Sequence, residues 1–266
     1  MLNKLITLFL IILPFGLHAQ ILNVEKERSN GEDSTQWVGN VTAAFSLKKQ
    51  QVEAMEFNLA SNAAYFSEKH AYILVGEIES LRGDGEFILS HGFGHFRTNL
   101  MRKNKLSYEL FSQIQYDDIR GMKNRWLTGA GLRYTMREKD TYQIAIGTGA
   151  MYEAENWYWT IEEDNEAEGW QKGDILSPSP ERLKSTSYIS LKYDISSKSF
   201  LNFITYYQAK FDSFHLPRIS GEFNLNIGIS KHLAFTTKAT YWYDAAPDIP
   251  IDKTNYSIQN GLTFSL

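Results

Sequence analysis

The sequence predicts an all-β protein: a single closed antiparallel transmembrane β-barrel of about twelve strands. Three observations predict it. From Gln36 onward apolar and polar residues alternate, many alternating segments reach about ten residues, and tight connections alternate with longer ones. Strands in soluble proteins are typically about five or six residues long, so the segment lengths favour tilted strands that cross a membrane.

Composition excludes several other classes. The 266 residues include 27 Lys and Arg against 31 Asp and Glu, a formal net charge of -4, and no cysteine. Nucleic acid is not an expected partner, because there is no basic excess to hold phosphates. The lack of cysteine excludes disulfide frameworks and Cys-ligated metal sites, and 14% aromatic residues are too many for a disordered chain.

The N-terminus predicts export. Lys4 precedes an apolar run that Pro14 interrupts, and a small residue follows at Ala19, which is the pattern of a secretory signal peptide over residues 1–19. An uncleaved anchor helix is the alternative. The predicted domains after the signal are a periplasmic N-terminal segment, residues 20–35, and an outer-membrane barrel domain, residues 36–266.

The alternation is clearest in the last three segments. Phe223 and Leu225 belong to an apolar face, whereas Glu222 and Asn224 belong to the opposite, polar face. The same pattern predicts strands, in order, near residues 36–47, 52–66, 70–81, 93–103, 105–117, 125–137, 141–153, 185–196, 199–211, 217–230, 232–244 and 254–266.

Alternation alone does not tell whether the apolar face points inward or into lipid. The predicted tight connections are residues 67–69, 103–104, 138–140, 196–198 and 231, and the longest of the others is 154–184. Short periplasmic turns and long external loops are typical of outer-membrane barrels, and aromatic residues such as Trp126, Tyr134 and Tyr152 lie near segment ends, where interfacial girdles occur. We therefore expect the apolar face to contact outer-membrane lipid and lipopolysaccharide, with both termini in the periplasm.

The chain end carries a resemblance. Gln259, Gly261, Phe264 and Leu266 resemble the C-terminal assembly signal of bacterial outer-membrane barrels, with Leu266 in place of the usual terminal Phe. This resemblance implies recognition by the barrel assembly machinery of a Gram-negative bacterium.

Three further segments are similar to the salt-induced outer-membrane protein family, a domain of unknown function. They are residues 92–97 (GFGHFR), 128–134 (TGAGLRY) and 260–264 (NGLTF). The resemblance extends over about residues 36–266. It implies an outer-membrane barrel and offers no catalytic residues to carry over.

If the apolar face is outward, the polar faces line the lumen, because a charge facing lipid at mid-membrane costs about 2 to 4 kcal/mol. Cross-strand ion pairs are expected between Glu109 and Arg133 and between Glu222 and Lys238. The lining forms either a pore wall for small solutes or a packed polar core, and strand number does not decide between them. The charged lumen-lining residues are Glu56, Glu77, Glu79, Arg97, Glu109, Arg133, Lys192, Glu222 and Lys238.

The connection predicted over residues 154–184 combines acidic residues such as Glu155 and Asp174 with aromatic residues such as Trp157. It could bind divalent cations, stack on sugars or constrict the lumen. A solvated external loop is the simpler interpretation. No calcium-loop spacing is present.

Neither a metal nor a cofactor is expected. His91 and His95 lie about 13 Å apart along one strand, too far for a single metal ion to bind both. A rim-sited hydrolase is suggested by two predicted rim loops. One holds Asp117 and Asp118 and the other holds Asp212 and His215, which are similar in residue type to the active site of omptin-type proteases. The His-x-Ser-Asn run of barrel phospholipases is absent. The sequence therefore favours a narrow passive channel or a structural envelope component over an enzyme, with a rim-sited hydrolase as the alternative.

Overall fold

The computed structural model describes residues 35–49, 53–83, 86–139, 141–164, 168–230 and 233–264. The predicted signal peptide and nearly all of the predicted periplasmic segment lie outside these residues. Of the predicted assembly signal, Gln259, Gly261 and Phe264 belong to the last strand, and Leu266 lies outside the described residues. No helix long and apolar enough to cross a membrane occurs in the described parts of the chain.

All the regular structure described is β-strand. The strands are β1 (Gln36–Lys49), β2 (Glu53–Phe66), β3 (His70–Gly83), β4 (Glu86–Leu100), β5 (Leu106–Asp117), β6 (Met122–Lys139), β7 (Tyr142–Trp157), β8 (Trp159–Thr160), β9 (Ile175–Leu176), β10 (Glu181–Ser196), β11 (Ser199–Lys210), β12 (Arg218–Gly228), β13 (Leu233–Asp244) and β14 (Thr254–Phe264).

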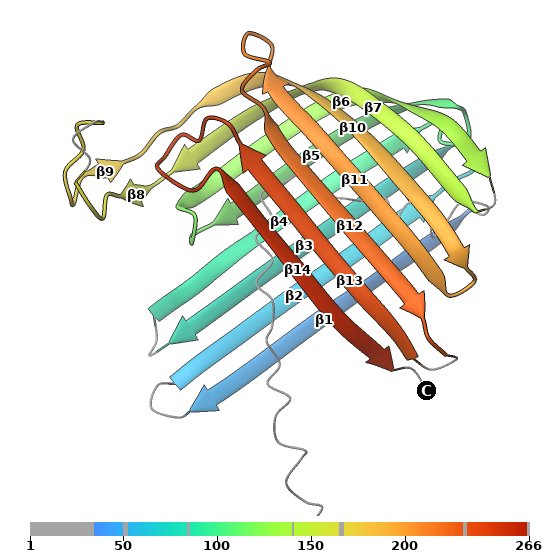
Figure 1. Ribbon diagram of the computed structural model, residues 1–266, viewed down its shortest axis with the longest axis horizontal. Helices are drawn as coiled ribbons and strands as arrows, with labels where there is room; N and C mark the ends of the chain where they lie inside the picture. The colour runs from blue at the N-terminus through green and yellow to red at the C-terminus, as the bar shows by residue number, and fades with distance from the viewer. Residues whose placement is uncertain are drawn as a thin grey trace, which may run out of the picture.

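Twelve of these strands form one antiparallel sheet in which each strand pairs with its neighbours along the chain. The exception is β7, which pairs with β10 because β8 and β9 form a separate hairpin (Figure 1). The described residues thus contain fourteen strands, two more than expected. The extra pair interrupts the connection that was predicted to be a continuous loop.

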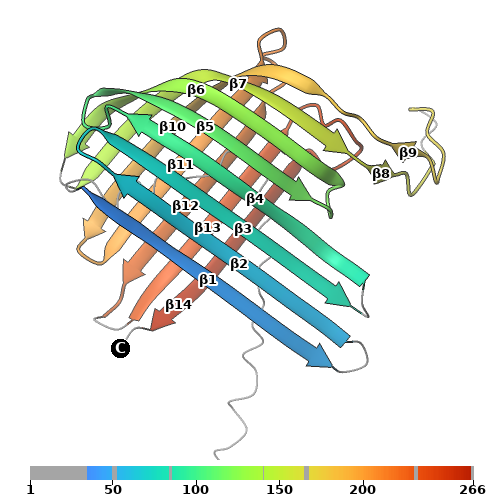
Figure 2. The same ribbon diagram turned by 180° about the vertical axis from the view of Figure 1, so that it is seen from behind.

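The sheet curls strongly. Strands β5, β6, β7 and β10 form the bend, β1 to β4 form one wall, and β11 to β14 form the other (Figures 1 and 2). The predicted closure is not observed, since no pairing joins β1 to β14 in the described residues. The reason is geometric: the two edge strands run in crossing directions in both views, whereas ladder pairing requires aligned strands about 4.8 Å apart.

Every predicted segment matches an observed strand, and only β4 begins more than four residues from its expected start. The cause is a bulge. Leu81 pairs with Leu89, but Arg82 pairs with Phe87, so one additional residue breaks the alternation. Residues that were predicted to form a long connection are therefore strand.

The connections define two ends of the sheet. At the turn end lie the connections 67–69, 101–105, 140–141, 197–198 and 229–232, and at the opposite loop end lie 50–52, 84–85, 118–121, 158–180, 211–217 and 245–253. The predicted asymmetry of connection lengths therefore holds from the sixth strand onward and fails for the first four strands, whose connections at the loop end are short.

The buried face of the sheet is the polar one. On β5, Glu109, Gln113 and Gln115 are at most 3% exposed, whereas the intervening Leu110 and Ile114 are 46% and 41% exposed. We call the buried face the inner face and the opposite one the outer face. This distribution reverses that of a soluble sheet, which buries its apolar side chains.

Glycines on the inner face of β6 and β7 allow close approach. A Cβ atom on Gly147 would lie 2.1 Å from the ring of Tyr188, and one on Gly149 would lie 2.2 Å from the carbonyl oxygen of Ala130. At Gly147 the missing side chain makes room for an aromatic ring, and at Gly149 it lets two backbones meet.

Replacing Gly149 with alanine should lower the free energy of unfolding by about 1 to 3 kcal/mol, because the new methyl group must push β6 and β7 apart. The control is Gly221→Ala on β12, where a Cβ atom would meet its nearest neighbour at an ordinary 3.6 Å. The measurement is the temperature at which the folded band is lost on a denaturing gel. Equal loss temperatures for the two variants would contradict the close approach.

Candidate functional site

A cluster of ionised side chains lies on the inner face near the loop end. Its members come from β6, β7, β10, β12 and β13, and we call it the ion-pair network: Arg125, Glu153, Glu155, Lys184, Arg218 and Asp244. Arg125 and Glu153 are completely buried. Three cationic and three anionic side chains leave the network with no net charge, which is the condition for burying ions.

Two arginines hold the network together. Arg125 donates from Nε to Glu153 at 2.9 Å and lies 3.1 Å from Glu155. Arg218 donates to Glu155 at 2.8 Å, to Glu153 at 3.2 Å and to Asp244 at 3.0 Å. Arg218 on β12 thereby reaches β7, with which it shares no ladder, so the contacts cross the space enclosed by the curl.

Residues in the loop-end connections, together with strand residues beside them, cover this network. Arg182 contacts Glu155 at 3.3 Å and also contacts Asp248, while Arg120 lies over the ring of Trp242 at 4.1 Å. Burial lowers the pKa of Arg120 to about 10, so the side chain is still charged at neutral pH.

An apolar layer follows the network along the strands toward the turn end. It consists of Phe111, Leu127, Met151, Ile204 and Tyr206, with Tyr188 packed against it. Leu127 is two residues after Arg125 on the inner face of β6, and Met151 is two residues before Glu153 on β7. The inner face is thus apolar at this level.

Beyond the apolar layer lies a second, smaller polar group. Arg97 lies 3.7 Å from Glu109, the hydroxyl of Tyr188 donates to Glu109 at 2.8 Å, and Arg133 donates to that hydroxyl at 3.2 Å. The predicted partners Glu109 and Arg133 therefore both contact the hydroxyl of Tyr188, and Arg97 is an ion-pair partner of Glu109.

A cavity of about 350 Å³ opens near the turn end between β11 and β14. Most of the residues that line it carry amide or hydroxyl groups, and one carries an ammonium group. The polar residues that line it from the inner face are Asn202, Asn224, Asn226, Thr236, Lys238 and Gln259.

Three of the predicted lumen residues, Lys192, Glu222 and Lys238, lie on the strands of this wall or on the neighbouring strand β10. The ladder places Lys238 opposite Asn224, and Asn224 donates to Glu222 at 2.6 Å. Lys192 lies 3.6 Å from Asp194. The pair expected between Glu222 and Lys238 is therefore offset by one cross-strand position, with Asn224 beside both residues.

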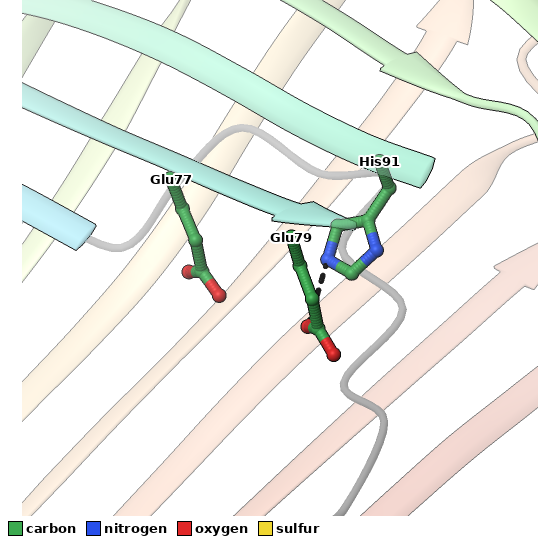
Figure 3. A group of neighbouring side chains, drawn as sticks. All are labelled: Glu77, Glu79 and His91. Atoms are coloured by element: carbon green, nitrogen blue, oxygen red, sulfur yellow. Dashed lines mark ion pairs between the residues drawn. The ribbon is translucent and has the colours of Figure 1, made fainter. Parts of the chain in front are cut away.

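A third group, on the opposite wall, contains two of the predicted lumen glutamates. Glu77 and Glu79 on β3 lie beside His91 on β4, and one ligand atom of each residue lies within 4.8 Å of the others (Figure 3). The ladder pairs His91 with Glu79 on one side and with Asp117 on the other. These three side chains could hold a metal ion, and Glu56 on the neighbouring strand β2 is a further carboxylate on this wall.

The rim residues of the hydrolase alternative have separate partners. Asp117 is buried and accepts a hydrogen bond from the backbone of Arg120, Asp118 lies 3.4 Å from Lys123, and Asp212 accepts from Ser213. His215 is exposed. Within the described residues no contact joins the Asp117–Asp118 pair to Asp212 or His215.

The ion-pair network was missed at the level of sequence. Glu155 was assigned to a connection over residues 154–184, which is wrong, because β7 runs to Trp157 and β10 begins at Glu181. Alternate residues of a strand share one face, so extending each strand toward the loop end would have found the network. Arg125 lies an even number of residues from the predicted lumen residue Arg133 and therefore belongs to the same face.

This is an all-β protein. It consists of a curled antiparallel sheet with an apolar outer face and a polar, charge-bearing inner face. Residues 41–266 match a family described as "Protein of unknown function, DUF481", and the chain belongs to that family. Membership agrees with the predicted resemblance to a domain of unknown function, and the salt-induced description stays a prediction.

Solved structures similar to this chain include two membrane-channel proteins. One is the NanC porin in a rhombohedral crystal form, with 11% identity, a TM-score of 0.43, and coverage of 86% of this chain and 99% of the porin chain. The other is the CymD monoaromatic hydrocarbon channel, with 10% identity, a TM-score of 0.40, and coverage of 85% and 78%. No curated protein matches the chain.

Replacing Arg125 with methionine should lower the free energy of unfolding by about 3 to 5 kcal/mol, because Glu153 and Glu155 would lose a buried partner. Lys123→Met is the matched control: it lies two residues away on β6, and its ion pair with Asp118 is half exposed, so the cost should be about 1 kcal/mol or less. Urea unfolding followed by tryptophan fluorescence measures both. Similar costs for the two variants would refute a stabilising role of the network.

Proposed function

We propose that this chain is an integral outer-membrane β-barrel protein that acts as a narrow passive channel for small polar solutes. The observation that carries the proposal is the reversal of the two faces. Leu110, Ile146 and Ile189 are each more than 40% exposed, while charged residues are buried behind them. In water the exposed apolar side chains would forgo the free energy gained on burial. In a bilayer the apolar outer face contacts lipid, and the polar inner face is kept away from it.

The choice of membrane rests on the sequence. The predicted signal peptide, the C-terminal assembly signal and the resemblance to a family of outer-membrane proteins all favour the outer membrane of a Gram-negative bacterium. In that membrane the outer face would contact lipid and lipopolysaccharide, and barrel closure would satisfy the free edges of β1 and β14.

The inner face supports a narrow passage of weak selectivity. At the loop end the ion-pair network occupies the inner face with balanced charges, and near the turn end the cavity offers amides, hydroxyls and one ammonium group. Rings of like-charged side chains are one source of ion selectivity, so a charge-balanced network at the loop end favours small polar solutes over ions of one sign.

The apolar layer favours a second candidate, a structural component of the envelope. Phe111, Leu127 and Met151 are packed with little exposure, and side chains that fill the inner face in this way leave less room for a solute. The contacts of Asp117, Asp118, Asp212 and His215 give the hydrolase alternative no support.

Leu110→Arg should reduce the free energy of unfolding in lipid vesicles by about 2 to 4 kcal/mol, because the guanidinium group would face the hydrocarbon region. The matched control is Ile175→Arg: that side chain is also exposed, but it lies in the β8–β9 hairpin away from the main sheet (Figure 1). The hairpin variant should unfold like the unmodified protein. If Leu110→Arg is equally harmless, the outer face does not contact lipid.

In a planar bilayer, the refolded protein should give steady conductance steps at low voltage, and Lys238→Glu should shift the reversal potential under a salt gradient toward cations. Lys238 lines the cavity, so reversing its charge changes the lining. Lys172→Glu makes the same charge change in the exposed connection after β8 and should leave the reversal potential unchanged. Silence from correctly folded protein would instead support the structural role.

A further inference from the structure

The wall formed by β3 and β4 differs from the rest of the inner face in how its carboxylates are neutralised. Glu109, Glu153, Glu155 and Asp244 each contact an arginine. Glu77 and Glu79 contact no lysine or arginine among the described residues, and Glu56 adds a third negative charge that repels Glu79. This group therefore carries an excess of negative charge that no lysine or arginine of the described residues contacts.

The cross-strand geometry brings nitrogen and oxygen donors together. The ladder places His91 opposite Glu79, and Glu77 lies two residues along the same face of β3. Figure 3 shows the carboxylate of Glu79 beside the imidazole ring, with Nε2 of His91 3.4 Å from Oε2, and the carboxylate of Glu77 on the same side of the sheet.

The spacing suits a small metal ion. The donor atoms of the three residues lie within 4.8 Å of one another. Zinc binds imidazole nitrogen and carboxylate oxygen at about 2.0 to 2.2 Å, so two donors to one ion are separated by at most about 4.4 Å. Small side-chain rotations are enough to close this difference.

His91 provides an independent observation. The residue is 5% exposed, and neither ring nitrogen makes a hydrogen bond, since Nε2 is only at ion-pair distance from Glu79. A buried polar group without a hydrogen-bond partner is costly, and coordination of a metal ion would use the lone pair on Nε2. His95, on the same face of the same strand, differs because its Nδ1 atom makes a 2.8 Å hydrogen bond with Gln113.

We propose that Glu77, Glu79 and His91 form a binding site for one divalent transition-metal ion on the inner face of the sheet. One imidazole and two carboxylates match the ligand preferences of Zn²⁺, whereas Ca²⁺ and Mg²⁺ prefer oxygen ligands alone. The side chain of Glu79 is 16% exposed, so the site is open to ions and water on the lumen side. Water completes the coordination of the ion.

The test is a calorimetric titration of the refolded protein in detergent with Zn²⁺ as the only probe. We expect one ion to bind per chain and His91→Ala to weaken the binding at least about tenfold. His95→Ala is the matched control, since it removes a buried histidine from the same face of β4 and should leave zinc affinity unchanged. Folding of each variant is checked by its gel mobility before heating.

Glu79→Gln keeps the size of the side chain while removing a charge, and it should weaken zinc binding at least about tenfold as well. If His91→Ala does not fold, the zinc affinity of Glu79→Gln tests the proposed site instead. The proposal is overturned if the unmodified protein binds no zinc at about millimolar concentration, or if folded His91→Ala or Glu79→Gln binds it as tightly. The titration needs no bilayer, so its outcome is independent of whether the protein conducts.

Discussion

The structure depends on one electrostatic constraint: a charge that leaves water for the inner face must meet an opposite charge or a hydrogen-bond partner there. Arg218 shows how the fold meets it. Its guanidinium group contacts Glu153 and Glu155 on β7 and Asp244 on β13. Because β12 and β7 share no ladder, these contacts hold the two sides of the curl together, which backbone hydrogen bonds between neighbouring strands do not do.

The inner face is layered along the strands, and the layers have different consequences for passage. The ion-pair network at the loop end has no net charge. The apolar layer around Leu127 and Met151 offers no partner to an ion. The cavity beside Lys238 is lined mostly by polar residues. In the proposed channel, a solute that enters from the turn end would meet polar groups first and the apolar and ion-paired layers last. If the sheet closes as proposed, the packing of the apolar layer decides between a channel and a filled barrel.

The sequence predicted the strands because period-two alternation is a local property. It failed at β4, where the bulge near Leu81 interrupts the alternation, and at closure, which depends on the accumulated twist of twelve strands. The candidate site was harder to predict from the sequence, because knowing which residues meet across two strands requires the register of their pairing. Sequence reasoning compared His91 with His95 along one strand, whereas the structure places His91 beside Glu79 on the next strand.

Buried carboxylates on the inner face are therefore handled in two different ways. Where arginines lie opposite glutamates, as around Glu153, the chain neutralises its own charge, and the side chains are withdrawn from solvent. Where Glu77 and Glu79 face His91, the described residues provide metal-binding donors but no lysine or arginine. Carboxylates without a cation retain their affinity for one. The unbalanced wall is thus the part of the inner face whose charge depends on the surrounding solution.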